Sequence, residues 1–142
     1  MTVVIDTNVV AYLLLGTERF VDESRCFMEA VEHGLAPALW EAELANVLWM
    51  AIRQGVMPPE EGPKRLALAN RLRIHSVPSR TLWNGALVRA VRSGVAVYDT
   101  LFVELAVRER LPLATFDRQV LKAFPDVASR PGTLMARQGG FG

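Results

Sequence analysis

Four acidic side chains stand where a fold could gather carboxylates into one site. Asp6 directly follows a short run of β-branched residues, and Asp117 follows a second apolar run at residues 111–115. Glu43 lies inside an otherwise apolar segment with helical spacing, and Asp99 lies near the start of another such segment. Because ligands of α/β proteins bind outside the carboxyl ends of the strands, we expect Asp6 and Asp117 at that edge of a sheet.

The chemistry open to such a cluster is that of a hard metal ion. Neighbouring carboxylates repel one another, and with water around them they suit Mg²⁺ or Mn²⁺. A single cysteine, Cys26, and two histidines, His33 and His75, are too few for a thiolate or imidazole zinc cage. A metal on oxygen ligands can activate water and orient a phosphate, so the pattern predicts hydrolysis without a catalytic His, Cys or Ser.

Each acidic residue also has an explanation that involves no chemistry. Asp6, Asp99 and Asp117 could each cap the helix that follows. Glu43 could belong to the solvated face of its helix. The joint pattern favours a site, because two strands and two helices each contribute one carboxylate where a parallel sheet lets them converge.

The elements that must position these residues alternate along the chain. Strands or extended segments are expected at residues 3–5, 35–39, 74–77, 111–115 and 133–135. Helices are expected at residues 8–15, 20–32, 40–53, 60–72, 81–92 and 98–110. Strands separated by helices predict an α/β fold in which a parallel sheet is built with right-handed crossovers.

Length and composition suit one globular domain. The 142 residues are 51% hydrophobic, and we expect a single domain at residues 1–136 followed by a disordered tail at 137–142. The 16 basic and 15 acidic residues leave a net charge of +1, so any affinity for nucleic acid must come from where the charges sit. The chain begins without a basic segment before its first apolar run, and no apolar run approaches the length of a membrane span, so we expect a cytoplasmic protein.

Four short segments around the acidic residues form an ordered set. They are Val-Val-Ile-Asp-Thr-Asn-Val-Val at 3–10, Glu-Leu-Ala-Asn-Val-Leu at 43–48, Tyr-Asp-Thr-Leu-Phe at 98–102 and Leu-Ala-Thr-Phe-Asp at 113–117. In this order they resemble the successive motifs of the PIN domain family, and the similarity covers nearly the whole chain. The length also resembles that of the toxin members of VapBC toxin–antitoxin pairs.

The resemblance implies a fold, an activity and partners. The fold would be a three-layer α/β/α sandwich with a central parallel sheet. The activity would be Mg²⁺- or Mn²⁺-dependent endoribonuclease cleavage of RNA by the toxin of a type II toxin–antitoxin pair. A cognate antitoxin protein would fold over the site and inhibit it, and the toxin would form a homodimer.

The resemblance also assigns roles to individual residues. The family's acidic positions, catalytic and metal-binding, fall on Asp6, Glu43, Asp99 and Asp117. Polar positions that support them fall on Thr7, Asn8, Asn46 and Thr115. The expected role of these polar side chains is hydrogen bonding that fixes the orientation of the carboxylates.

Other classes of protein fit less well. Haloacid-dehalogenase-like phosphatases also present an Asp after a first strand, but their second Asp, two residues later, is Asn8 here, and no well-placed Lys follows. A receiver domain would want an acidic pair near the N-terminus and a Lys at a strand end, and neither is evident. The remaining alternative is a non-catalytic PIN-fold module that binds RNA or protein; it would be expected to lack one or more of the four acidic residues.

Residues outside the acidic set have more than one interpretation. Arg118 could contact a phosphate, although a surface role is favoured. A group of cations could form an RNA track or a solvated face: Lys64, Arg65, Arg71, Arg73, Arg89 and Arg92. Three tryptophans within amphipathic helices are expected in the core or at a subunit interface rather than as base-stacking platforms: Trp40, Trp49 and Trp83.

Overall fold

The computed structural model describes residues 1–139, which form a five-stranded sheet with helices on both faces. The strands are β1 Thr2–Ile5, β2 His33–Pro37, β3 Ile74–Val77, β4 Leu113–Ala114 and β5 Ala128–Ser129. The helices are α1 Thr7–Leu15, α2 Val21–Ala30, α3 Leu39–Arg53, α4 Glu61–Ala69, α5 Trp83–Ser93, α6 Val97–Glu109, α7 Arg118–Ala123 and α8 Pro131–Gly139. A single 3₁₀ turn, Ser79–Thr81, precedes α5.

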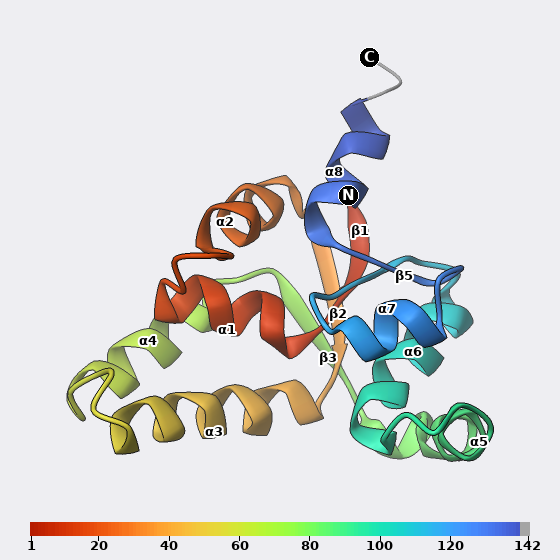
Figure 1. The fold of residues 1–142 in the computed structure, drawn as a ribbon, viewed down its shortest axis with the longest axis horizontal. Coiled ribbons are helices and arrows are strands. Elements are labelled where there is room, and N and C mark those ends of the chain that lie inside the picture. The colour runs from red at the N-terminus through yellow and green to blue at the C-terminus, as the bar shows by residue number, and fades with distance from the viewer. Residues whose placement is uncertain (140–142) are drawn as a thin grey trace.

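All four neighbouring strand pairs are parallel. Helices α1 to α4 lie on one side of the sheet, and α5 and α6 lie on the other (Figure 1). This arrangement confirms the three-layer α/β/α sandwich expected from the sequence. Within residues 1–139, no helix is long and apolar enough to cross a membrane.

The core is built around β1 and α6. Val3 and Val4 of β1 are fully buried, as a strand at the centre of a parallel sheet requires. Helix α6 packs against β1, β2 and β4, and its residues from Thr100 to Ala106 are all buried. Five of these seven residues are apolar, which suits a helix segment enclosed on most sides.

The strand order places a topological switch next to β1. The sheet runs β3-β2-β1-β4-β5, so the chain leaves β1 toward β2 and later returns to pair β4 on the other side of β1. Ile5 pairs with Ala114, which sets the residues that follow these two strands side by side. Open α/β sheets bind their ligands at this kind of point, outside the carboxyl ends of the strands.

Most of the predicted elements are confirmed, but the C-terminal region is not. The strand expected at residues 133–135 is wrong, because these residues lie in α8, and β5 was not predicted. Proline suits the first turn of a helix, where Pro131 begins α8, and Glu23 of α2 accepts a 2.9 Å hydrogen bond from the backbone N–H of Gly132. The disordered tail expected at 137–142 is wrong for residues 137–139, which belong to α8, and residues 140–142 lie outside the described part.

Candidate active site

Three of the four acidic residues lie at helix N-termini, and the fourth lies just beyond the first turn of its helix. Asp6 follows β1 and is the N-cap of α1, while Asp117 follows β4 and is the N-cap of α7. Asp99 lies in the first turn of α6, and Glu43 is the fifth residue of α3. Helix N-termini carry partial positive charge, so this arrangement favours carboxylates and also a phosphate brought to the same place.

A hydrogen-bond network fixes the carboxylate of Asp6. The Thr115 hydroxyl donates to Asp6 Oδ2 over 2.8 Å, and the Thr7 backbone N–H donates to Oδ1 over 2.8 Å. Asn8 Nδ2 donates to Thr115 Oγ1 at 3.2 Å and to Asp6 Oδ2 at 3.4 Å. The N–H of Asp117 donates to Thr115 Oγ1 at 3.0 Å, so one hydroxyl joins the ends of β1 and β4.

Of the other predicted polar residues, Thr7 and Asn8 form hydrogen bonds in the site and, among the described residues, Asn46 does not. The Thr7 hydroxyl donates a 2.9 Å hydrogen bond to Glu43 Oε1, which ties α3 to the start of α1. Asn8 Oδ1 accepts a 3.2 Å hydrogen bond from the backbone N–H of Phe116. The sequence could not indicate this contact, because its donor is a main-chain group. Asn46 is exposed, and within residues 1–139 its side chain makes no hydrogen bond.

Neighbouring charges within the acidic group contribute to the raised pKa values of three of its carboxylates. Burial raises the pKa of Asp6 to about 7, and the charges of Asp99 and Glu43 add to the rise, while the hydrogen bond from Thr115 opposes it. Burial likewise raises the pKa of Glu43, with a contribution from Asp99, and burial and Asp117 raise the pKa of Asp99. In the part of the chain that the structure describes, none of the four forms an ion pair with Lys, Arg or His.

The donor set fits a hard divalent cation held in an open site. The candidate ligands are carboxylate oxygens, and within residues 1–139 no basic side chain forms an ion pair with them. Among residues 1–139, no three acidic, histidine or cysteine side chains form a ready-made cage for an ion. Mg²⁺ rarely needs such a cage, because it commonly keeps several waters and takes one or two carboxylates together with substrate phosphates.

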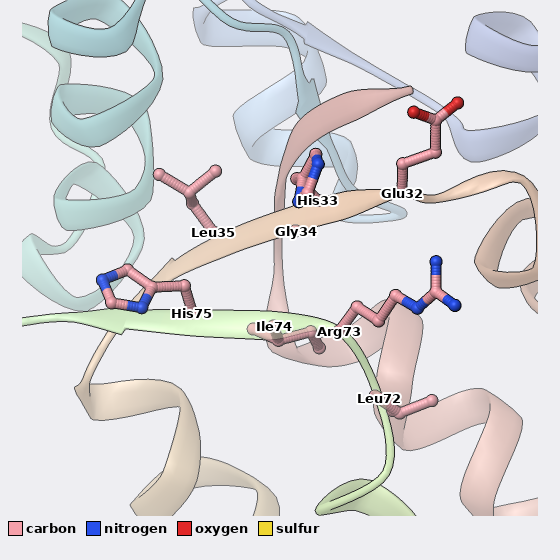
Figure 2. A pocket seen from close by; sticks show the side chains of 8 residues that line it. All are labelled: Glu32, His33, Gly34, Leu35, Leu72, Arg73, Ile74 and His75. Carbon is pink, nitrogen blue, oxygen red and sulfur yellow. The ribbon is translucent and has the colours of Figure 1, made fainter.

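A separate hollow lies over strands β2 and β3, away from the acidic residues that follow β1 and β4. It has a volume of about 680 Å³, and its lining includes His33 and Leu35 of β2 and Arg73 and His75 at β3 (Figure 2). These residues lie in the first halves of their strands or just before them, whereas the carboxylates follow the ends of β1 and β4. The hollow contains both histidines of the chain and none of the four acidic residues, so it is not the candidate active site.

Three of the six cations considered for an RNA track form ion pairs with nearby carboxylates. Lys64 and Arg65 pair with Glu61 within α4, and Arg89 pairs with Glu104 across α5 and α6. Arg118 is exposed on α7.

The three tryptophans differ in burial. Trp40 is a core residue, and its indole N–H donates to Ser76 Oγ at 2.8 Å. Trp49 and Trp83 are 51% and 52% exposed, so for these two a core position is wrong and the interface role stays a prediction.

An all-parallel α/β/α sandwich with acidic residues at the switch point beside β1 defines the class of this protein. A family model described as PIN domain matches residues 3–128, and the chain belongs to that family. Ribonuclease VapC3 of Pyrobaculum aerophilum is 32% identical over 130 residues, which cover 88% of this chain and 96% of the relative. The two sequences therefore correspond over almost their whole lengths.

A solved structure shares the fold. It is described as VapBC2 from Rickettsia felis bound to a DNA fragment from their promoter. The matched chain is 12% identical, with a TM-score of 0.64, and the match covers 92% of this chain and 98% of that one. At this identity the similarity supports the architecture alone.

Proposed function

We propose that this protein is a metal-dependent endoribonuclease that hydrolyses RNA phosphodiester bonds as the toxin of a type II toxin–antitoxin pair. The observation that carries the proposal is the gathering of four carboxylates from separate elements: Asp6, Glu43, Asp99 and Asp117. Thr7 and Thr115 join Asp6 by hydrogen bonds to the Glu43 carboxylate and to the backbone N–H of Asp117. The charge of Asp99 contributes to the raised pKa values of Asp6 and Glu43, and the charge of Asp117 contributes to that of Asp99. The related protein named Ribonuclease VapC3 supports the choice of RNA. We propose a cytoplasmic location, since a toxin that cleaves cellular RNA would act there.

The four carboxylates would provide the protein ligands for Mg²⁺ or Mn²⁺, with water and the substrate phosphate completing the coordination. The bound ion supplies an activated water and offsets charge on the phosphate during hydrolysis. The residues around it give the carboxylates fixed orientations: Thr115 and the Thr7 amide hold Asp6, and the Thr7 hydroxyl holds Glu43. Such preorganisation matters because a misplaced ligand weakens both metal affinity and catalysis.

The test is incubation of the purified protein with total cellular RNA in Mg²⁺, in Mn²⁺ and in EDTA, followed by sequencing of the cleaved ends. We expect cleavage with either ion and none with EDTA. A thiol reagent at the exposed Cys26 should leave the cleavage unchanged, because no cysteine takes part. Cleavage that resists EDTA would contradict the metal requirement, and no cleavage under any condition would favour the non-catalytic PIN-fold module.

The partners follow from the same assignment. We propose a cognate antitoxin that covers the acidic site and a homodimer of the toxin. The structural relative is named as part of a VapBC2 complex, which motivates the search for an antitoxin. Co-expression with a small adjacent reading frame should give a stable complex that does not cleave RNA. A nuclease that stays active in excess of that partner would contradict the toxin role and leave the nuclease role intact.

A further inference from the structure

The exposed side of α3 continues from the acidic site to a tryptophan and an arginine. Asn46, Met50 and Arg53 follow Glu43 at three, seven and ten residues, so they extend along the same side of the helix. All three are exposed, and Trp49 borders the row. At about 1.5 Å per residue, Trp49 lies about 9 Å beyond Glu43 along the helix axis and Arg53 about 15 Å beyond it.

Trp49 and Arg53 form a mixed aromatic and cationic surface. The guanidinium carbon of Arg53 lies 4.9 Å from the centroid of the Trp49 ring. Together with Met50 and Gln54 they line a hollow of about 340 Å³. Within residues 1–139 no carboxylate forms an ion pair with Arg53, so its charge is available to an anion.

This chemistry matches a nucleotide better than an apolar protein surface. An exposed aromatic ring can stack on any base, and an arginine beside it can contact a phosphate. A stacked strand advances about 3.4 Å per nucleotide, so the offset of about 9 Å between Glu43 and Trp49 along α3 corresponds to a few nucleotides. The surface is also continuous with the side of α3 that carries Glu43.

The other exposed tryptophan has different surroundings. Trp83 lies on α5 with Leu87 and Val91, which are 55% and 78% exposed. Arg108, in the last turns of α6, donates a hydrogen bond to the carbonyl of Thr81, so this end of α5 lies by the end of α6 opposite Asp99. Trp83 is therefore not continuous with the acidic site, although Arg80 also lies over its ring.

We propose that Trp49 and Arg53 form a binding site for single-stranded RNA next to the cleavage position, with a base stacked on Trp49 and a phosphate held by Arg53. The proposal rests on the proposed ribonuclease function and adds the substrate class to it. It assigns Trp49 and Arg53 to substrate binding and not to the chemical step. Trp83 then serves as a matched control, with the same side chain, nearly equal exposure and an arginine over its ring.

The test measures fluorescence anisotropy of a labelled, mixed-sequence single-stranded RNA oligonucleotide in EDTA, where no cleavage occurs. Trp49→Ala should weaken binding by roughly fivefold to a hundredfold, the range for loss of one stacked base. Trp49→Phe should retain most of the affinity, and Trp83→Ala should match the parent. Arg53→Gln should lower the slope of log affinity against log salt by about 0.7. In Mg²⁺, Trp49→Ala should raise KM and leave kcat near the parent value.

Two results would overturn the proposal while leaving the ribonuclease function standing. In the first, the parent cleaves RNA and Trp49→Ala binds RNA as tightly as the parent. In the second, Trp49→Ala changes the molar mass in light scattering without changing RNA affinity, which would make this surface a protein interface. A parent that neither binds nor cleaves RNA with Mg²⁺ or Mn²⁺ would instead overturn both proposals. Circular dichroism of each variant verifies that the fold is retained.

Discussion

Two of the three acidic residues of helix α6, Asp99 and Glu104, lie in opposite environments. Asp99 belongs to the carboxylate cluster with Asp6, where burial and neighbouring charges raise pKa values. Glu104, five residues later and only 8% exposed, accepts hydrogen bonds from Arg89 at 2.7 Å and Arg108 at 2.8 Å. Burial alone would raise the pKa of Glu104, but the two arginines outweigh it and lower the pKa.

Glu104 with its two arginines stabilises the fold, whereas the carboxylate cluster that contains Asp6 and Asp99 lowers the stability of the metal-free protein. The Glu104 carboxylate faces Gly85 of α5, where any side chain would collide with it, so a glycine lets α5 pack closely against the ion pairs. Around Asp6 no cation is supplied by residues 1–139, and the repulsion is unrelieved in the metal-free protein. Strained charge of this kind is typical of functional sites, where activity is maintained at the expense of stability.

Of the substitutions considered, Asp6→Asn should have the largest effect, a loss of RNA cleavage. It removes one charge with almost no change in volume, and RNA cleavage should fall by more than the roughly 10–100-fold typical of losing a partner of a metal ligand. Initial rates of RNA cleavage in Mg²⁺ measure the effect, with circular dichroism to verify the fold. Asp22→Asn, at an exposed position that pairs with Arg25, should leave the rate unchanged. Equal rates for both variants would remove Asp6 from the active site.

The pH dependence of stability should show the sign of the Asp6 shift. Its pKa of about 7 in the folded protein exceeds the ordinary 3.8, so between pH 4 and 7 the unfolded chain has lost a proton that the folded chain keeps. Stability of the metal-free parent relative to Asp6→Asn should therefore fall as pH rises through this window, by on the order of 2–4 kcal/mol, and level off above it. Urea unfolding of both proteins in EDTA at several pH values gives the difference. A difference that stays constant with pH would contradict the shift.

Glu104→Gln should lower the stability of the protein and leave RNA cleavage unchanged. It leaves Arg89 and Arg108 without their carboxylate, which should cost about 1–3 kcal/mol of unfolding free energy, less than for a fully buried pair because both arginines are partly exposed. Because the folded pKa of Glu104 is lowered, its stabilisation is present above its ordinary pKa of 4.5 and is lost as the pH falls below that value. Urea unfolding and RNA cleavage at neutral pH measure the two effects. A large loss of activity in the folded variant would place Glu104 in the catalytic machinery.

Asp99→Asn should give the smallest change in stability, and it should stabilise the metal-free protein where Glu104→Gln destabilises it. Removing one of several repelling charges should leave the metal-free protein as stable as the parent or more stable, by up to about 1 kcal/mol. Mg²⁺ at ten times its Kd should stabilise the parent by about 1.4 kcal/mol and the variant by much less. Thermal unfolding with EDTA and with Mg²⁺ measures both. Identical Mg²⁺ responses would indicate that Asp99 acts only as a helix residue and not as a ligand.

The sequence by itself determined where the carboxylates would stand and what kind of fold would hold them. Apolar runs that end at Asp6 and just before Asp117, and helical periodicity around Glu43 and Asp99, are local patterns that the backbone converts directly into strands and helices. The strand at Ile74–Val77 was predicted with its observed bounds for the same reason. The parallel pairing of the strands then follows from the helices between them, because a helical crossover returns the chain to the same end of the sheet.

Only the tertiary structure decided which faces are covered and which groups meet. Periodicity shows that a helix has an apolar side, but another element must cover that side to bury it; Trp40 is covered, whereas Trp49 is not. Helix α8 is anchored by Glu23, which lies 109 residues from Gly132 in sequence, a distance that no local pattern can bridge. The opposite pKa shifts of Asp99 and Glu104 likewise depend on charges from other elements and on other turns of α6, because electrostatic energy follows distance in space and not separation along the chain.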